Sequence, residues 1–247
     1  MRIAMMTTCL VDALFPDVGK SVVTVLERLG HEVIVPQGQA CCGQMHINTG
    51  YVDDALPVVR NQVEALSGVN ADAVVAPSGS CVGSVRHQHV NLARNAGDED
   101  LARQAQELSD KTYEFSELLV DVLGVEDVGA YFPHTVTYHP TCHSLRMLRV
   151  GDKPLRLLRA VDGVDLVELP GAQECCGFGG TFALKNEPVS SAMLADKVAA
   201  IETTGADICS TSDSSCLMHI GGGLSRLETG VGTKHLAQIL ASTKESG

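Results

Sequence analysis

The chain has 247 residues, with 30 acidic and 18 basic side chains and a formal net charge of −12. This balance argues against nucleic acid and against an anionic membrane surface, because both are bound mainly through Lys and Arg. No apolar run approaches the roughly 20 residues of a spanning helix, and the N-terminus lacks the pattern of a signal peptide. We therefore expect a cytoplasmic protein without membrane insertion.

Short apolar runs alternate with segments of helical spacing in the first half of the chain. Gly30 follows the first helical segment and suits a left-handed helix end. Pro57 fits the second helical segment only if it lies in the first turn. The expected order is strand 3–6, helix 18–29, strand 33–35, helix 52–66 and strand 73–76.

The second half repeats this order after an acidic, helical stretch over 98–123. Strands that alternate with helices predict right-handed βαβ units and parallel sheets. The predicted fold class is therefore α/β, with two pseudo-symmetric halves. We place them at 1–126 and 127–247, near the usual domain size. The expected elements are strands 135–139, 165–169 and 207–210, a helix over 188–204 and a last helix over 234–242.

Eight of the nine cysteines form an internal repeat. Each copy has a lone cysteine, then a Cys-Cys-Gly triplet, then a further cysteine, and the spacings are C-x31-CCG-x37-C and C-x32-CCG-x38-C. Every member follows a predicted strand, and the carboxyl ends of parallel strands share one edge of a sheet. We therefore expect one four-thiolate site per half: Cys9, Cys41, Cys42 and Cys81 in the first, and Cys142, Cys175, Cys176 and Cys216 in the second.

Four converging thiolates in a reducing compartment indicate an iron–sulfur cluster or zinc. Gly43 and Gly177 provide the backbone freedom that lets a vicinal cysteine pair aim at one centre. The chain has no C-x2-C pair, which zinc sites commonly use, and the long spacing favours the bulkier cluster. Zinc remains the alternative. Cys209 lies outside the repeat, within a predicted strand, and is expected to be a core thiol.

Both copies resemble the CCG domain that occurs twice in one of the subunits of heterodisulfide reductase and in iron–sulfur subunits of the glycolate oxidase type. The strings MTTCLVDALFP, CCGQ, APSGSC, YHPTCH and ECCGFGG resemble the lactate utilization protein A family, and this resemblance covers essentially the whole chain. It implies an iron–sulfur electron-transfer subunit that helps to oxidise L-lactate to pyruvate. The implied partners are other iron–sulfur subunits of a lactate-oxidising complex.

The fuller CCG pattern ends in C-x2-C, but Ser78 and Asp213 stand where the fifth cysteines would be. We expect both to be turn and cap residues, with oxygen ligation of iron as the alternative. Two [4Fe–4S] cubanes, one per half, are then the simpler expectation. His46 and His143 share the cysteine loops and are the preferred histidines for tuning a cluster.

Two other functions stay open at this point. The wider CCG group suggests a thiol–disulfide reductase of the heterodisulfide type, although the missing fifth cysteines weaken that interpretation. A zinc-stapled structural protein is the third hypothesis. The sequence offers no organic-substrate site as explicit as its cysteine sites.

Overall fold

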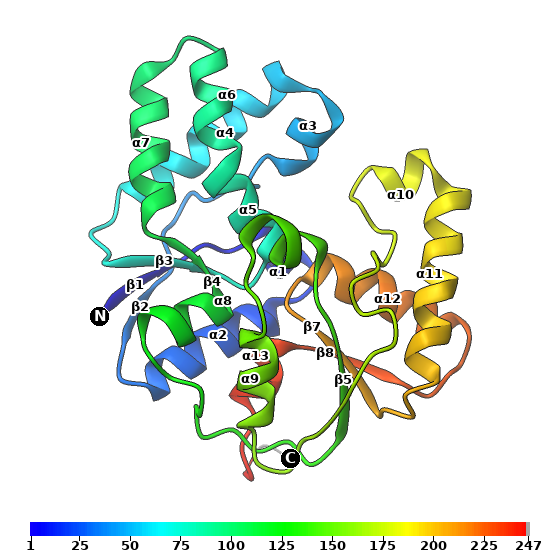
Figure 1. Ribbon diagram of the computed structural model, residues 1–247. Helices are drawn as coiled ribbons and strands as arrows, with labels where there is room; N and C mark the ends of the chain where they lie inside the picture. The colour runs from blue at the N-terminus through cyan, green and yellow to red at the C-terminus, as the bar shows by residue number, and fades with distance from the viewer. Residues whose placement is uncertain (246–247) are drawn as a thin grey trace.

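In residues 1–245, which the computed structural model describes, the strands form two four-stranded sheets in which all neighbours run parallel. The strand orders are β2-β1-β3-β4 and β6-β5-β7-β8, so the second sheet repeats the topology of the first. The α/β class and the two similar halves are thus confirmed. The two sheets lie side by side, each with its own set of helices (Figure 1).

The predicted strands and helices of the first half occur in the predicted order, with additional helices both between them and after the third strand. They are β1 (Arg2–Met5), α1 (Cys9–Ala13), α2 (Pro16–Arg28), β2 (Glu32–Ile34), α3 (Gln44–Thr49), α4 (Val52–Ser67), β3 (Ala73–Ala76), α5 (Gly79–His87), α6 (His89–Asn95), α7 (Glu99–Asp110), β4 (Thr112–Glu114), α8 (Phe115–Glu117) and the π-helical η1 (Leu118–Val122).

The second half has fewer helices between its third and fourth strands. Its elements are β5 (Thr135–His139), the π-helical η2 (His143–Leu148), α9 (Lys153–Arg159), β6 (Asp165–Val167), α10 (Phe182–Lys185), α11 (Glu187–Glu202), β7 (Ile208–Thr211), α12 (Ser214–Arg226), β8 (Gly232–His235) and α13 (Leu236–Ala241).

Each sheet has a fourth strand that the sequence did not predict. β4 pairs with β3 and β8 pairs with β7, so the helices expected over 98–123 and 234–242 are each interrupted or shortened by a strand. The last residue of each strand, Glu114 or His235, is also the N-cap of the next helix. The helical pattern therefore follows the strand without a gap and hides it.

Two helix-end signals had different outcomes. Gly30 follows α2 with a φ of 82°, as predicted for a left-handed helix end. Pro57 lies inside α4, which begins at Val52, so it is beyond the first turn and the helix continues through it. The missing N–H of Pro57 costs α4 one backbone hydrogen bond.

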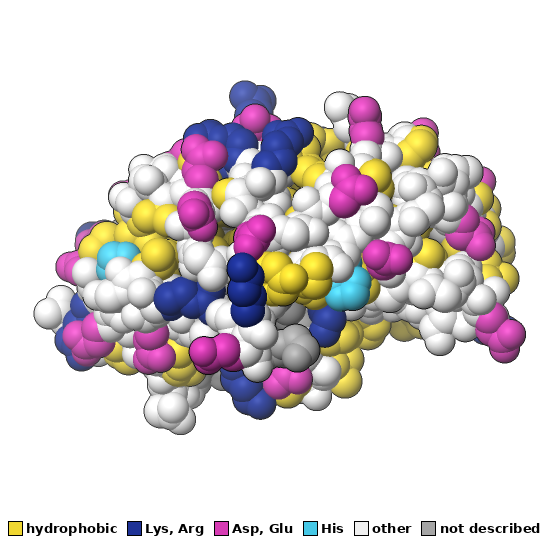
Figure 2. All heavy atoms as spheres, turned by 90° about the horizontal axis from the view of Figure 1, so that it is seen from below, with side chains coloured by type: hydrophobic (Ala, Val, Ile, Leu, Met, Phe, Trp, Pro, Cys, Tyr) yellow, Lys and Arg dark blue, Asp and Glu magenta, His cyan; other side chains and the backbone are white. Residues whose placement is uncertain are grey.

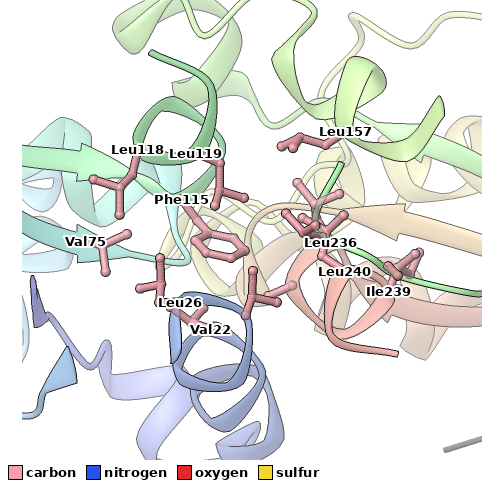
Figure 3. Packing of buried hydrophobic residues seen from close by; sticks show 14 of the residues in the cluster. Val22, Leu26, Val75, Phe115, Leu118, Leu119, Leu157, Leu236, Ile239 and Leu240 are labelled. Atoms are coloured by element: carbon pink, nitrogen blue, oxygen red, sulfur yellow. The ribbon is translucent and has the colours of Figure 1, made fainter. Parts of the chain in front are cut away.

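One hydrophobic core is shared by the two halves. Leu26 of α2 and Phe115 of α8 pack in the same cluster as Leu157 of α9 and Leu236 of α13, and Figure 3 shows these side chains pointing toward one another from both sides. The Arg28 guanidinium extends this contact by donating hydrogen bonds to the carbonyl oxygens of Leu240, at 3.1 Å, and Ala241, at 2.5 Å. The halves are therefore held in a defined relative position.

The face opposite the upper helices of Figure 1 carries charged side chains of both signs among single apolar groups (Figure 2). Among the described residues, no helix has the length and apolar character needed to span a membrane.

Candidate metal centre

The repeat cysteines lie where the parallel strands end, as predicted. Cys9 opens α1 directly after β1, and Cys81 lies in the first turn of α5 after β3. Both helices have a side-chain cap: Thr8 Oγ1 accepts from Val11 N at 3.4 Å, and Ser78 Oγ accepts from Cys81 N at 3.2 Å. The caps fix the first turn of each helix and hence the position of its cysteine.

The glycine after each vicinal pair is required by the backbone. Gly43 has a φ of 77° and Gly177 a φ of 93°, both in the left-handed region. A Cβ on Gly177 would also lie 2.6 Å from the carbonyl oxygen of Ser190 in α11. Only glycine combines this turn with such a close approach, so these residues let two adjacent thiols face the same centre.

All eight repeat cysteines line one cavity of about 200 Å³ between the two halves. Its rim includes Met45 and Asn48 of α3 from the first half, and Phe178 and Thr181 before α10 from the second. The sequence predicted one four-cysteine group per half. The additional finding is that the two groups face the same cavity from opposite walls. Cys9 is the exposed member of the set.

Within each group, neighbouring sulfurs are close enough to form hydrogen bonds with one another. Cys176 Sγ and Cys216 Sγ are 3.5 Å apart, and the Gly177 N–H donates to Cys175 Sγ at 3.4 Å. Hydrogen bonds from Cys142 and Cys176 lower the pKa of the Cys175 thiol to about 2, and hydrogen bonds from Cys42 and Cys9 lower the pKa of the Cys41 thiol to about 2.

The neighbours that donate to these two thiolates show the opposite effect. Hydrogen bonding to Cys41 and burial raise the pKa of Cys9 and Cys42, and hydrogen bonding to Cys175 and burial raise the pKa of Cys142 and Cys176. In each vicinal pair, the hydrogen-bonding neighbours therefore stabilise one sulfur as the thiolate. A bound cation would reverse this balance by accepting all four sulfurs as thiolates, so the residues present fit a metal centre.

The positions of the missing fifth cysteines meet across the boundary between the halves. Asp213 Oδ2 accepts from Ser78 Oγ and from Ser80 N, each at 3.0 Å. Its Oδ1 accepts from Ser215 N at 3.1 Å and Oγ at 2.7 Å. Ser78 and Asp213 are the N-caps of α5 and α12, which confirms the predicted cap role. Because both carboxylate oxygens of Asp213 are hydrogen-bonded, the arrangement favours a structural role over iron ligation.

Further polar contacts join the two walls of the cavity. The side-chain amide of Gln44 lies 2.9 Å from His143 Nε2 and donates to the Ser80 carbonyl at 3.1 Å. Thr49 and Thr181 hydroxyls are 2.9 Å apart. His143 is thus placed on the cavity wall, as predicted from its neighbour in the sequence. His46 lies on α3, with a buried Nδ1 that has no hydrogen-bond partner among the described residues.

Two histidines make contacts with the cysteine groups that the sequence did not predict. His89 opens α6, is fully buried and donates from Nε2 to the Cys42 carbonyl at 2.7 Å, so it anchors the first vicinal pair. His139 ends β5 and lies beside Cys176 and Cys216. Its place, three positions before Cys142 at the end of an apolar strand, was the signal available in the sequence.

The ninth cysteine has the predicted role. Cys209 lies in β7, is buried within the core of the second half and does not line the cavity. Burial raises the pKa of its thiol to about 12, so it stays protonated.

The comparison with protein families identifies the repeat. The cysteine-rich CCG domain family matches the chain twice, over residues 3–86 and 136–221. Each matched segment contains one complete cysteine group.

Full-length relatives carry one shared name, lactate utilization protein A. The protein of that name from Bacillus velezensis is 46% identical over 98% of this chain and 100% of its own length. Those from Oceanobacillus iheyensis and Bacillus subtilis are 43% and 44% identical, over 100% and 98% of this chain and 99% and 100% of their own lengths. The chain belongs to the lactate utilization protein A family and contains two CCG domains.

A solved aspartate racemase homologue from Pyrococcus horikoshii covers 97% of this chain and 95% of its own, with a TM-score of 0.35 and 11% identity. That likeness is too distant to bear on function.

Proposed function

We propose that the protein is an iron–sulfur electron-transfer subunit of a multi-protein oxidoreductase that converts L-lactate to pyruvate in the cytoplasm. The observation that carries the proposal is the convergence of eight cysteines, four from each half, on one cavity. The name shared by the full-length relatives supports the lactate pathway.

We assign one [4Fe–4S] cluster to each half, residues 1–126 and 127–247. The proposed ligands are Cys9, Cys41, Cys42 and Cys81 for the first cluster, and Cys142, Cys175, Cys176 and Cys216 for the second. Bound there, such clusters carry single electrons, which a two-electron oxidation of a hydroxy acid must release in turn. The Ser78–Asp213 contact and the shared core hold the two cysteine groups in a fixed position relative to each other. The chain's own contribution is therefore to position two redox sites beside each other, and the partners are other iron–sulfur subunits.

The decisive experiment is anaerobic purification followed by iron, sulfide and zinc analysis and EPR. We expect about eight iron and eight sulfide per chain, as two [4Fe–4S] clusters require. The Cys42→Ala and Cys176→Ala variants should each lose one cluster and keep the other, and Cys209→Ala is the matched control that should keep both. Two zinc ions per chain without iron would refute the proposal, and so would the loss of both clusters in each single variant.

One observation favours a second candidate. Both cysteine groups face the same cavity, so a small organic disulfide that entered it could reach a centre in either half, and a thiol–disulfide reductase requires such access. Incubating the cluster-loaded protein with small disulfides and a reduced dye tests this function. Absence of turnover would eliminate it and leave electron transfer.

A further inference from the structure

His139 is a buried side chain without a partner. It is the last residue of β5 and has no exposed surface. Neither ring nitrogen has a hydrogen-bond partner among the described residues. An unsatisfied buried polar group destabilises the folded state, and each such group in a folded protein requires an explanation.

A nitrogen of His139 lies next to two sulfurs of the second cysteine group. The ligand atoms of His139, Cys176 and Cys216 all lie within 4.8 Å of one another. Imidazole nitrogen and thiolate sulfur are both ligands of iron and zinc, and the three residues come from different elements. An ion held between them would give the His139 nitrogen the partner that the protein itself does not provide.

Other buried histidines show what an ordinary structural role looks like in this protein. His89 donates to the Cys42 carbonyl at 2.7 Å, and His235 donates to the Pro77 carbonyl at 3.1 Å. Both are fully buried, and both use Nε2 to satisfy a backbone oxygen. His139 has the same burial without such a bond. His139 therefore differs from these structural histidines because its ring nitrogens are not occupied by hydrogen bonds and are free to bind a metal.

The first half has a different residue at the corresponding place. Three positions before Cys9, where His139 stands relative to Cys142, the first half has the buried side chain of Met6. Met6 packs in the hydrophobic core of its half. His46 of α3 also has a buried Nδ1 without a hydrogen-bond partner among the described residues, but it belongs to no group of three ligand atoms within 4.8 Å of one another. Among the described residues, only the second cysteine group therefore has a histidine nitrogen that close to two of its sulfurs.

We propose that His139 binds the metal centre of the second cysteine group through a ring nitrogen, as a fifth ligand beside the four cysteines, while the first site has sulfur ligands alone. The inference rests on the proposed function in taking the centre to be an iron–sulfur cluster, whereas the ligand role itself applies to any bound metal. Neutral imidazole adds no charge to the site. The two sites then differ in the number and the type of their ligands.

Pulsed EPR on reduced, cluster-loaded protein with ¹⁵N-labelled histidine tests the ligand directly. We expect a strongly coupled histidine nitrogen in the unsubstituted protein. His139→Met, which copies Met6, should abolish this coupling and leave both cluster signals present. His219→Gln is the matched control, because His219 lies on α12 near the same group and contacts Ser190 Oγ at 3.5 Å. It should keep the coupling.

The possible outcomes separate the inference from the proposed function. Clusters without a coupled histidine nitrogen would overturn the inference and leave electron transfer standing, and this result needs no variant to fold. Coupling that survives in His139→Met, or disappears in His219→Gln, would also overturn it. A protein without iron would instead refute the proposed function. Cobalt(II) titration of the metal-free chain then decides the ligand role, since His139→Met should alter the visible spectrum and His219→Gln should not.

Discussion

Gly79 lies at a close contact between the halves, and an added methyl group there should be costly. Gly79 opens α5, two residues before Cys81, and faces Ser144 in η2, two residues after Cys142. A Cβ on Gly79 would lie 2.0 Å from Ser144 Oγ, 3.1 Å from its Cβ and 3.2 Å from its backbone nitrogen, where ordinary contact begins at 3.4 Å. The hydroxyl alone can rotate away, but the Ser144 backbone can move only if the halves separate.

Overpacking of a rigid contact costs about 1–3 kcal/mol, and we expect Gly79→Ala to reach the upper end, about 3 kcal/mol. Ser144→Gly removes two of the three clashing atoms, so in that background the cost should fall to about 1 kcal/mol, a coupling of about 2 kcal/mol. Gly222→Ala is the matched control. Gly222 is exposed in α12 and has nothing within 4 Å of an added Cβ, so the variant should gain about 0.5–1 kcal/mol from helix propensity.

Urea unfolding of the reduced, metal-free variants, followed by circular dichroism, measures these differences. A Gly79→Ala protein within about 0.5 kcal/mol of the parent, or single effects that simply add in the double variant, would refute the described packing of η2 against α5. Iron content of the same variants shows whether the clash also disturbs the cysteine groups.

Three further predictions concern charge and metal. Burial raises the pKa of the Glu114 carboxyl from 4.5 to about 7, so its contribution to stability is complete below pH 4.5 and is lost as the pH rises toward 7. Glu114→Gln cannot ionise and should gain up to about 3 kcal/mol relative to the parent between pH 5 and pH 8 in urea unfolding, and a pH-independent difference would contradict this. Arg28→Met removes the hydrogen bonds to Leu240 and Ala241 and should cost about 2 kcal/mol by the same assay, whereas Arg103→Met, at an exposed ion pair, should be nearly neutral. Chelation of the metal under reducing conditions should lower Tm by about 5–10 °C in thermal melts, and an unchanged Tm would argue against a metal that binds the folded state.

The sequence pattern identified the strand ends and, with them, the cysteine groups. In each half the lone cysteine, the Cys-Cys-Gly triplet and the last cysteine follow three successive strands, so the repeat itself indicates where these strands end. It did not reveal β4 and β8, since the last residue of each already caps a helix. It also did not place the two groups on one cavity. That arrangement depends on long-range contacts such as Ser78 with Asp213, and a repeat in sequence does not encode how its copies dock.

His139 illustrates a related limit. Its position at a strand end could be predicted from the sequence, but that position alone does not distinguish a metal ligand from an ordinary histidine at the end of a strand. Its distinguishing property is the absence of a hydrogen-bond partner among the described residues, which only the packed structure reveals. The turns at the vicinal pairs, by contrast, could be predicted from the sequence, because a glycine follows each pair and adopts the positive φ that the turn needs.

The packing of α2 on α13 has a consequence for the order of events during synthesis. The shared core needs Leu236 and Leu240, which follow all eight repeat cysteines in the chain, before Leu26 is fully covered. Contacts of such high sequence separation form late and slow a folding reaction. All eight repeat cysteines are therefore translated before the core between the halves can close. A newly made chain presents two open sets of thiols, and we expect the proposed metal centres to be loaded most easily in that interval.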